Sequence, residues 1–427
     1  MSGTSAGFSE TGTTWIGHRR GSGQYVRIQF AMLLAGIATF AQLYAPQAVL
    51  PQIAEHFQVS VAESALMVSM GTGGLAVATI PWSLVADRIG RKLTITIAVT
   101  AATILGMIVT LMPTFELALA ARLVEGFALG GVPAVAMAYI NEEIHKMDAA
   151  AAVGTFIAGN AVGGLSGRIV SGPVGEFTGS WQAGFLAISA LSVISSILFM
   201  ILSPQPKGFT PVGAQGVSVW DLIKGTARNA WAHLHDPVLL VLYLQPFMLM
   251  GGFVALYNYL GYHLTAEPFS LPVWVSSLVF LAYLAGTASS PIAGRIAGAK
   301  GRKIVMLVCD AVALASLALM LVPNLIVIIG GLVVFTAAFF GSHSTASGWA
   351  GAHPTSGRAQ STALYNLSYY IGSSILGFVG GLFFQSLGWG ALIAMIAGVI
   401  TFAAIVALLV LPQKHQPDPK PFGRSRG

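Results

Sequence analysis

Residues 83–92 read SLVADRIGRK and join two long apolar runs, at 61–86 and 93–112. A related stretch, AGAKGRK, occupies residues 297–303 and matches the last seven residues of the first stretch, ADRIGRK, 211 positions further along the chain. Each copy is a short basic connection between two hydrophobic segments. A unit that recurs at a fixed offset indicates an internal repeat.

Two further matches support this repeat. FAQLY at 40–44 matches FVALY at 253–257, and GGLSGRIVSGPVGEFTGSW at 163–181 aligns with IGSSILGFVGGLFFQSLGW at 371–389. Their offsets of 213 and 208 residues agree closely with 211. Three matches in register indicate two related halves, as in the parallel repeats of some transporter folds.

The composition is that of a membrane protein. Hydrophobic residues make up 55% of the 427 residues and charged residues 8%, whereas a soluble domain carries about 25% charged residues. A spanning helix needs about 20 predominantly apolar residues. We therefore predict an all-α polytopic membrane protein with twelve transmembrane helices in two six-helix pseudo-symmetric bundles. The predicted spans are 26–48, 61–86, 93–112, 115–138, 149–172, 181–202, 238–260, 273–294, 303–322, 324–346, 360–384 and 389–411.

The longest polar stretch divides these runs into two sets of six. It covers residues 203–236 and contains prolines, glycines and a short amphipathic piece. The predicted organisation is a cytoplasmic tail at 1–25, an N-terminal bundle at 26–202, a cytoplasmic central loop at 203–236, a C-terminal bundle at 237–411 and a basic cytoplasmic tail at 412–427. The N-terminal region has no small-residue cleavage site after a short apolar core, which favours a tail over a cleaved signal peptide.

Basic residues are confined to alternate connections, to the span ends beside them and to the two tails, except for Arg122 and Arg168, which lie well inside predicted spans. The intervening connections contain glutamates but no Lys or Arg. Because Lys and Arg mark the cytoplasmic side, both termini are predicted to be cytoplasmic, in the cell membrane of a prokaryote. The same bias, together with anionic inner-leaflet lipid, accounts for the net charge of +6, so no nucleic-acid partner is expected.

Several classes of chemistry are disfavoured. The single cysteine, Cys309, excludes a disulfide framework, a multi-cysteine zinc site and an iron–sulfur cluster. The chain has no HExxH, Walker A or paired acidic metal motif. We therefore expect a protein that is not an enzyme and that needs no metal or cofactor.

Arg122 and Glu125 form the main candidate site. An arginine at the centre of a membrane helix costs about 2.5–3.5 kcal/mol, so it should face a partner or a wet cavity. The two residues are three positions apart and can pair on one helix face. They either bind a proton or substrate or form a permanent structural bridge. Arg168 is expected to serve the same cavity and to help hold an anionic or carbonyl group, unless it contacts Glu125 or helix-end carbonyls structurally.

Other polar residues in the spans are secondary candidates. Tyr44, Tyr257 and Asn258 lie at matching outer ends of the first and seventh spans, where they either gate or touch substrate or belong to an interfacial tyrosine belt. His343 could titrate near neutral pH or could be a hydrogen-bonded packing residue. Asn366 indicates that its polar-aromatic helix face lines the cavity.

The chain resembles the major facilitator superfamily over essentially its whole length. Residues 83–92 are similar to the family's loop signature G-x-L-a-D-r-x-G-r-k, with Ser83 in place of the usual glycine. In the second copy Gly298 replaces the aspartate. RLVEG at 122–126 resembles the motif R-x-x-q-G. The resemblance implies twelve helices and a monomeric transporter in which the helix that carries Arg122 lines the cavity.

The loop signature also suggests a conformational latch built from Asp87, Arg88, Gly90 and Arg91. Asp87 lies at a helix end, where it could accept hydrogen bonds from a neighbouring helix N-terminus such as the one near Ser361. Such a contact would join the two halves on the cytoplasmic side. The alternative is that these charges only set the topology.

The function that fits best is proton-coupled efflux of a small organic molecule by alternating access, as in the twelve-span drug–proton antiporters and sugar-efflux permeases that the chain resembles. Protonation of Glu125 would release Arg122 and change which state is stable. The alternative is an importer, symporter or uniporter of a small polar metabolite. The expected partners are this solute, protons and the lipid bilayer.

Overall fold

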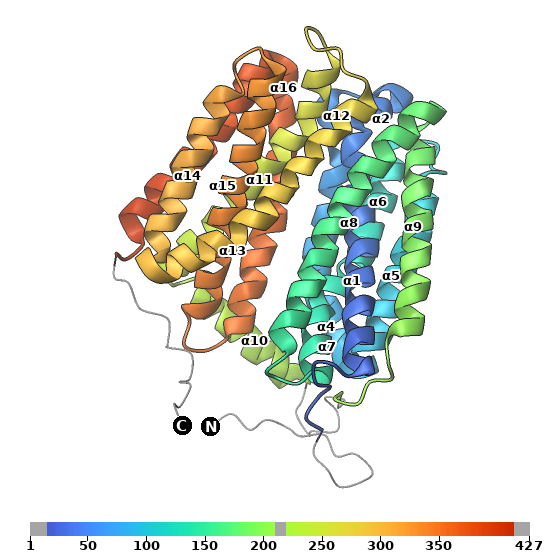
Figure 1. Ribbon diagram of the computed structural model, residues 1–427, viewed down its shortest axis with the longest axis vertical. Coiled ribbons are helices and arrows are strands. Elements are labelled where there is room, and N and C mark those ends of the chain that lie inside the picture. The colour runs from blue at the N-terminus through green and yellow to red at the C-terminus, as the bar shows by residue number, and fades with distance from the viewer. Residues whose placement is uncertain (1–14, 210–218, 414–427) are drawn as a thin grey trace. The chain divides into compact units, whose positions relative to one another are not determined.

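The computed structural model describes residues 15–209 and 219–413 (Figure 1). These residues are helical apart from connections and one isolated bridge between His18 and Ile144, so the all-α prediction is confirmed for them. Parts of the predicted tails and central loop, at 1–14, 210–218 and 414–427, lie outside the described residues.

Nine helical stretches within the described ranges are long and apolar enough to cross a membrane. They are Gly23–Ala48, Val61–Ile89, Arg91–Val109, Phe115–Glu143, Trp181–Leu202, Pro237–Thr265, Val273–Lys300, Leu325–Ala352 and Gln360–Val410. The chain is therefore a polytopic membrane protein by length and composition.

Four predicted spans appear differently in the structure. α8 (Ala149–Thr178) and α14 (Arg302–Leu319) are helices but are not among the nine stretches; α14 contains Arg302, Lys303 and Asp310. The predicted spans at 360–384 and 389–411 form one 53-residue helix, α16 (Arg358–Val410), interrupted at Gly388. Gly388 has a φ of 78° and a ψ of −168°, which a residue with a side chain rarely adopts, and this explains the break.

The chain divides into two compact units. Unit 1 comprises Met1–Lys224 and Leu260–Phe280, and unit 2 comprises Gly225–Tyr259 and Leu281–Gly427. The helices that lie wholly in unit 1 are α1 (Gly23–Tyr44), the 3-10 helix η1 (Ala45–Ala48), α2 (Leu50–Phe57), α3 (Val61–Ser64), α4 (Leu66–Ile89), α5 (Arg91–Val109), α6 (Phe115–Leu129), α7 (Gly131–Glu143), α8, α9 (Trp181–Leu202) and α12 (Val273–Ser277). Unit 2 contains α13 (Tyr283–Lys300), α14, α15 (Leu325–Ala352) and α16. Three helices cross the division, namely α10 (Val219–His233), α11 (Pro237–Thr265) and η3 (Leu278–Ala282).

Glycine allows α8 to lie directly against α1. Small residues let membrane helices approach closely, because hydrophobicity alone does not favour helix contacts over lipid. Three glycines four residues apart form one face of α8 and meet the backbone of α1: Gly159 at Leu33, Gly163 at Ile37 and Gly167 at Ala41. This contact fixes the position of α8, and with it Arg168, beside the end of α1.

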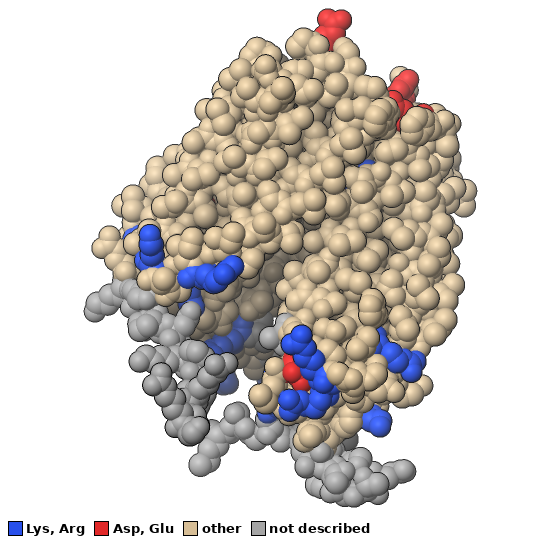
Figure 2. All heavy atoms as spheres, viewed as in Figure 1, with Lys and Arg blue, Asp and Glu red and all other residues tan. Residues whose placement is uncertain are grey.

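Each unit has its own buried core. In unit 1 a cluster that includes Ile28, Val99 and Tyr139 joins α1, α5 and α7. In unit 2 a cluster that includes Leu242 and Met306 joins α11 and α14. On the face shown in Figure 2, Lys and Arg of each unit gather chiefly at one end of that unit.

Candidate functional site

The site in unit 1 is built around the end of α1. Pro46 lies in the 3-10 helix that follows α1, and a proline cannot donate the backbone hydrogen bond that would continue an α-helix. The last carbonyls of a helix lack partners within it. Arg122 on α6 donates hydrogen bonds to two of these carbonyls. Its Nη1 donates to the Gln42 carbonyl at 3.4 Å and its Nη2 to the Leu43 carbonyl at 3.0 Å. Arg122 therefore caps α1, where its positive charge faces the negative end of the helix dipole.

The remaining bonds of Arg122 tie three helices together. Nε donates to the Met67 carbonyl of α4 at 3.0 Å, and Nη1 donates to Glu125 Oε2 at 2.8 Å. The ion pair is the one that the spacing of three residues predicts. Both side chains are buried, with exposed fractions of 0% and 1%. Gly71 leaves room for the guanidinium, because a Cβ there would lie 2.5 Å from Nη2.

Gln42 is a member of the site that the sequence analysis missed. Its Nε2 donates to the Ala38 carbonyl at 2.9 Å and to Thr103 Oγ1 at 3.4 Å. Because a carbonyl only accepts, these bonds fix the orientation of the amide and leave Oε1 without a partner among the described residues. A Cβ at Gly106 would lie 3.1 Å from Gln42 Oε1 and 3.2 Å from Glu125 Oε1, so both acceptor oxygens adjoin the same point.

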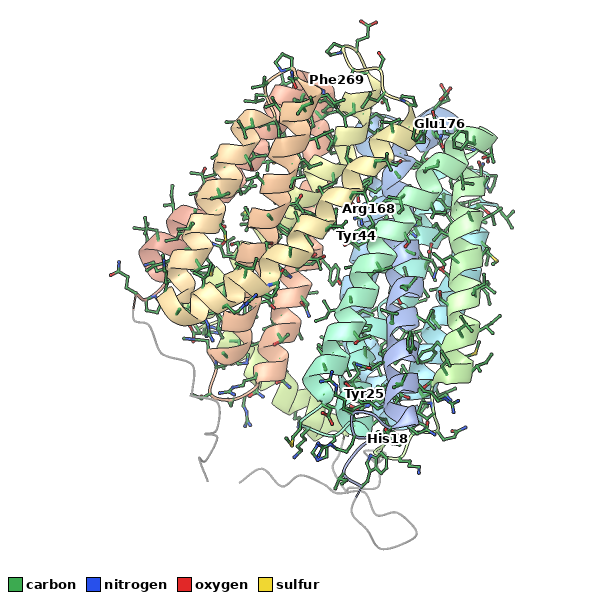
Figure 3. The ribbon with its side chains drawn as sticks, viewed as in Figure 1. His18, Tyr25, Tyr44, Arg168, Glu176 and Phe269 are labelled. Carbon is green, nitrogen blue, oxygen red and sulfur yellow. The ribbon has the colours of Figure 1, made fainter. Side chains whose placement is uncertain are left out.

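Arg168 contacts the 3-10 helix η1 that follows α1. Its Nε donates to Gln47 Oε1 at 2.6 Å and its Nη1 to the Gly164 carbonyl at 2.7 Å. The guanidinium lies 4.1 Å from the centre of the Tyr44 ring and 5.0 Å from that of Phe280. Figure 3 shows Tyr44 beside Arg168, partway along unit 1 between His18 at one end and Glu176 at the other. The two buried arginines of the sequence analysis thus bind neighbouring parts of one segment, residues 42–47.

The candidates of unit 2 lie in two places. Tyr257 on α11 is buried, and its hydroxyl forms a 2.7 Å hydrogen bond with Thr336 Oγ1 on α15; Asn258 is also buried. His343 on α15 is bonded through Nδ1 to the Tyr365 hydroxyl at 2.9 Å. This geometry is that of a hydrogen-bonded packing histidine. Asn366 is not part of this cluster, since its side chain is exposed and its buried neighbour Tyr365 is the residue that faces His343.

The signature loop forms a chain of charges within unit 1. Arg91 donates from Nη1 to Asp87 Oδ1 at 2.5 Å and from Nε to Glu142 Oε1 at 3.0 Å. Gly90 separates α4 from α5 at a φ of 94°, which favours glycine, while Arg88 is exposed. Sequence reasoning did not identify Glu142, although it adjoins a second acid at the end of the fourth span. The proposed contact of Asp87 with the helix near Ser361 stays a prediction.

Within residues 15–209 and 219–413, no group of three or more His, Cys, Asp or Glu side chains is placed to hold a metal ion. The polar centres of the described spans are instead arginine, carboxyl, amide and hydroxyl groups that bond to one another and to backbone carbonyls. Such groups can bind a polar solute or exchange a proton without a cofactor.

The helical fold defines a multi-pass membrane protein with buried polar centres, and comparison with known proteins gives its family. A family model described as the Major Facilitator Superfamily matches residues 32–375 and 274–426. The chain belongs to this superfamily and is therefore a transport protein, not an enzyme.

Individual relatives agree with this assignment. The chain is 36% identical to the inner membrane transport protein YnfM of Escherichia coli strain K12 over 398 residues. The alignment covers 93% of each protein. It is 35% identical to the uncharacterized MFS-type transporter YybF of Bacillus subtilis strain 168, over 91% of this chain and 94% of that one. The protein is therefore a multi-pass inner membrane protein of bacterial type.

The fold also matches solved transporters. The crystal structure of the nucleoside transporter NupG aligns with a TM-score of 0.73 at 15% sequence identity, over 90% of this chain and all of that chain. The identity is low, so the match establishes the shared fold alone.

Proposed function

We propose that this protein is a monomeric, proton-coupled efflux transporter that exchanges a small organic molecule for protons by alternating access. It would belong with the drug–proton antiporters and sugar-efflux permeases of the superfamily. The observation that carries the proposal is the buried pair of Arg122 and Glu125 at the end of α1, with the partnerless Gln42 Oε1 beside it.

The proposed topology has twelve spans with both termini in the cytoplasm. α8, α14 and the second part of α16 add three spans to the nine stretches that are apolar by composition. The distribution of Lys and Arg in the sequence supports the orientation, because these residues stay on the cytoplasmic side.

A proton on Glu125 would change the hydrogen bonds around the end of α1 in two ways. Arg122 would lose the one charged acceptor that it has among the described residues and keep the carbonyls of Gln42, Leu43 and Met67. The new O–H of the carboxyl group would give the partnerless Gln42 Oε1 a donor in its vicinity. Glu125 would thus bond differently in its charged and neutral forms, which makes the stability of this arrangement depend on protonation.

Arg168 and Tyr44 would bind the solute when the site opens. Their aromatic and cationic surfaces adjoin the same segment, residues 42–47, that Arg122 caps. Proton binding and solute binding would therefore act on one piece of backbone. A proton driven by a potential of about 100 mV supplies about 2.3 kcal/mol, which corresponds to roughly fifty-fold extrusion.

The test uses purified protein in liposomes with an internal pH dye and an imposed pH gradient, and screens drugs, sugars and organic acids for solute-dependent proton movement. We expect a solute that moves protons in the wild type but not in Glu125→Gln, which should still exchange solute. Glu116→Gln is the matched control, because Glu116 is an exposed acid in the first turn of the same helix.

Three results would change the proposal. Solute exchange without proton flux in the wild type would identify a uniporter. Proton flux that persists in Glu125→Gln would leave antiport standing but would exclude Glu125 as the proton site. Solute and proton movement in the same direction would identify a symporter.

A further inference from the structure

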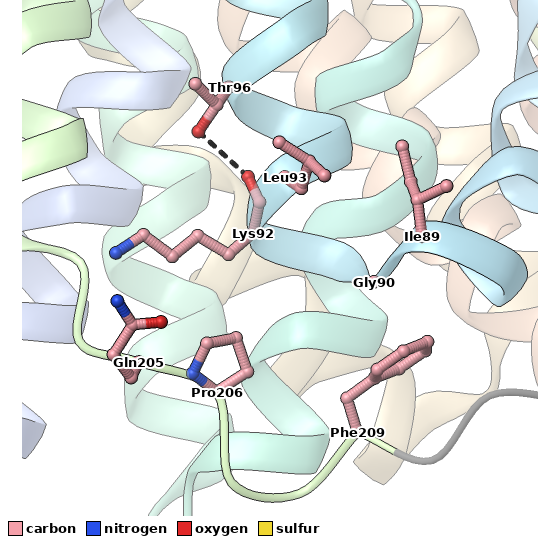
Figure 4. A pocket seen from close by; sticks show the side chains of 8 residues that line it. All are labelled: Ile89, Gly90, Lys92, Leu93, Thr96, Gln205, Pro206 and Phe209. Atoms are coloured by element: carbon pink, nitrogen blue, oxygen red, sulfur yellow. Dashed lines mark hydrogen bonds between the residues drawn. The ribbon is translucent and has the colours of Figure 1, made fainter.

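Two adjoining pockets lie at one end of unit 1, on either side of Lys92. The first has a volume of about 470 Å³ and is lined by the N-terminal segment, α1, α5, α9 and the chain after α9. The second, of about 440 Å³, lies between the start of α5 and residues 205–209 (Figure 4). Lys92 and Gln205 line both pockets. The space is therefore large enough for a headgroup rather than for a single ion.

Among the described residues, the larger pocket is lined by cationic side chains and by no acid. Arg27, Lys92 and Lys207 line it, and His18 adds a fourth basic group. Burial and the nearby Lys207 charge lower the pKa of His18, which agrees with a positive local potential. Glu143, beside Lys207, is buried, and its carboxylate accepts the backbone N–H groups of Lys207 and Gly208.

The charges of Arg27 and Lys92 are not neutralised within the described residues. Arg27 donates to the carbonyls of Ile201 and Leu202, at 3.0 and 3.2 Å, and Lys92 donates to the Ser203 carbonyl at 2.5 Å. These bonds cap the end of α9. They use two of the five N–H donors of Arg27 and one of the three of Lys92, so donors remain for an anion.

Other cations at the same end of unit 1 behave differently. Arg91 binds the carboxylates of Asp87 and Glu142, and Arg19 binds that of Asp148. Carboxylates are therefore available at this end, yet none of them lines the larger pocket. The pocket keeps a net positive charge while Arg19 and Arg91 are paired.

The walls of the two pockets include apolar side chains that are exposed on the helices. Ile201 on α9 is 61% exposed and Leu93 on α5 is 51% exposed, and Met200 lies beside Ile201. A free phosphate would gain nothing from these side chains. A ligand with an anionic head and hydrocarbon chains would contact both the cations and the apolar wall.

We propose that the larger pocket binds the phosphate group of an anionic phospholipid, with Arg27, Lys92 and Lys207 around the headgroup and the acyl chains along α5 and α9. The site is independent of the proposed solute and proton chemistry. It joins the end of α9 and residues 203–209 to α1 and α5 through one shared ligand. A lipid here would stabilise unit 1 by mass action, since it binds only the folded protein.

The test measures lipid binding to the detergent-purified full-length protein by native mass spectrometry. The probes are phosphatidylglycerol and phosphatidylcholine with the same acyl chains, since choline cancels the charge of the phosphate. We expect at least one phosphatidylglycerol to be retained in preference to phosphatidylcholine. Arg27→Gln and Lys92→Gln should each weaken that preference about five-fold. Lys300→Gln, which removes an exposed cation of unit 2, should not change it.

Lys207→Gln is the third pocket variant. Its ammonium group contacts the Trp15 ring, so folding should tolerate its loss. Equal retention of both lipids, or a preference that survives in all three pocket variants, would overturn the proposal. Displacement of phosphatidylglycerol by inorganic phosphate at equal concentration would also overturn it, because the site would then take free phosphate without the lipid chains.

Discussion

The Arg122 guanidinium donates to the Leu43 carbonyl at 3.0 Å, so a side chain of α6 caps the end of α1. The same guanidinium pairs with Glu125 and reaches Met67 on α4. Arg122, whose charge is costly inside a membrane, is thus hydrogen-bonded on several sides. Its ionisable acceptor among the described residues is Glu125, the group proposed to carry the proton.

Loss of Arg122 should destabilise the protein far more than loss of Glu125. Arg122→Gln leaves the Glu125 carboxylate and three carbonyls without their donor, and breaking a buried pair in this way costs about 3–5 kcal/mol. Glu125→Gln keeps an acceptor for Arg122 and should cost about 1 kcal/mol. Thermal unfolding in detergent measures both, and equal losses would contradict the capping role of Arg122.

The contact between α1 and α8 should not tolerate a side chain at residue 163. A Cβ at Gly163 would lie 2.7 Å from the Ile37 Cα, so Gly163→Val must push the two helices apart. We expect a loss of at least about 2 kcal/mol, in the range of overpacked cores. Gly154→Val on the same helix is the control, because nothing lies within 4 Å of a Cβ there. Similar stability of the two variants would exclude the predicted overpacking.

The topology can be tested by cysteine labelling in a Cys309→Ser background. Lys300→Cys should react with a membrane-impermeant maleimide only after the cytoplasmic side is exposed, and Glu267→Cys should react in intact cells. Both positions are exposed in the structure. Labelling of both from the same side would contradict an arrangement in which α13 crosses the membrane between them.

Asp148 should hold the N-terminal segment against the connection between α7 and α8. Its carboxylate accepts the Arg20 backbone N–H at 3.0 Å and pairs with Arg19. These bonds lower the pKa of Asp148, so the contact is intact at neutral pH and is lost only as the pH falls through the lowered folded-state pKa. At neutral pH, Asp148→Asn should accelerate tryptic cleavage after Arg19 and Arg20. An unchanged cleavage rate would mean that other contacts hold the segment.

Hydropathy and charge predicted the membrane helices and both buried arginines, because a long apolar run and an isolated charge are local features of a sequence. The partners of Arg122 could not be predicted in the same way. Which carbonyls of α1 lack partners depends on where the helix changes at Pro46, and the approach of Met67 depends on the register of α4. Gln42 carried the same signal as the arginines, a polar group inside an apolar run, and could have been found.

The different surroundings of adjacent residues on one helix were harder to predict. Tyr365 and Asn366 are neighbours in a polar-aromatic stretch, and a step of one residue turns a helix by about 100°. The structure places Tyr365 against His343 and leaves Asn366 exposed. The glycines at 159–167 are a local feature of the sequence, but the identity of their partner helix as α1 depended on the fold.

The most direct test of the central claim is infrared difference spectroscopy of the purified protein between acidic and alkaline pH. The account predicts a carboxylic-acid C=O band that titrates in the wild type, disappears in Glu125→Gln and persists in Glu116→Gln. The band should shift in Gln42→Leu, because Gln42 Oε1 would accept a hydrogen bond from the protonated Glu125 carboxyl group. A spectrum that is the same in the wild type and in Glu125→Gln would show that Glu125 takes up no proton, and the proposed coupling would be wrong.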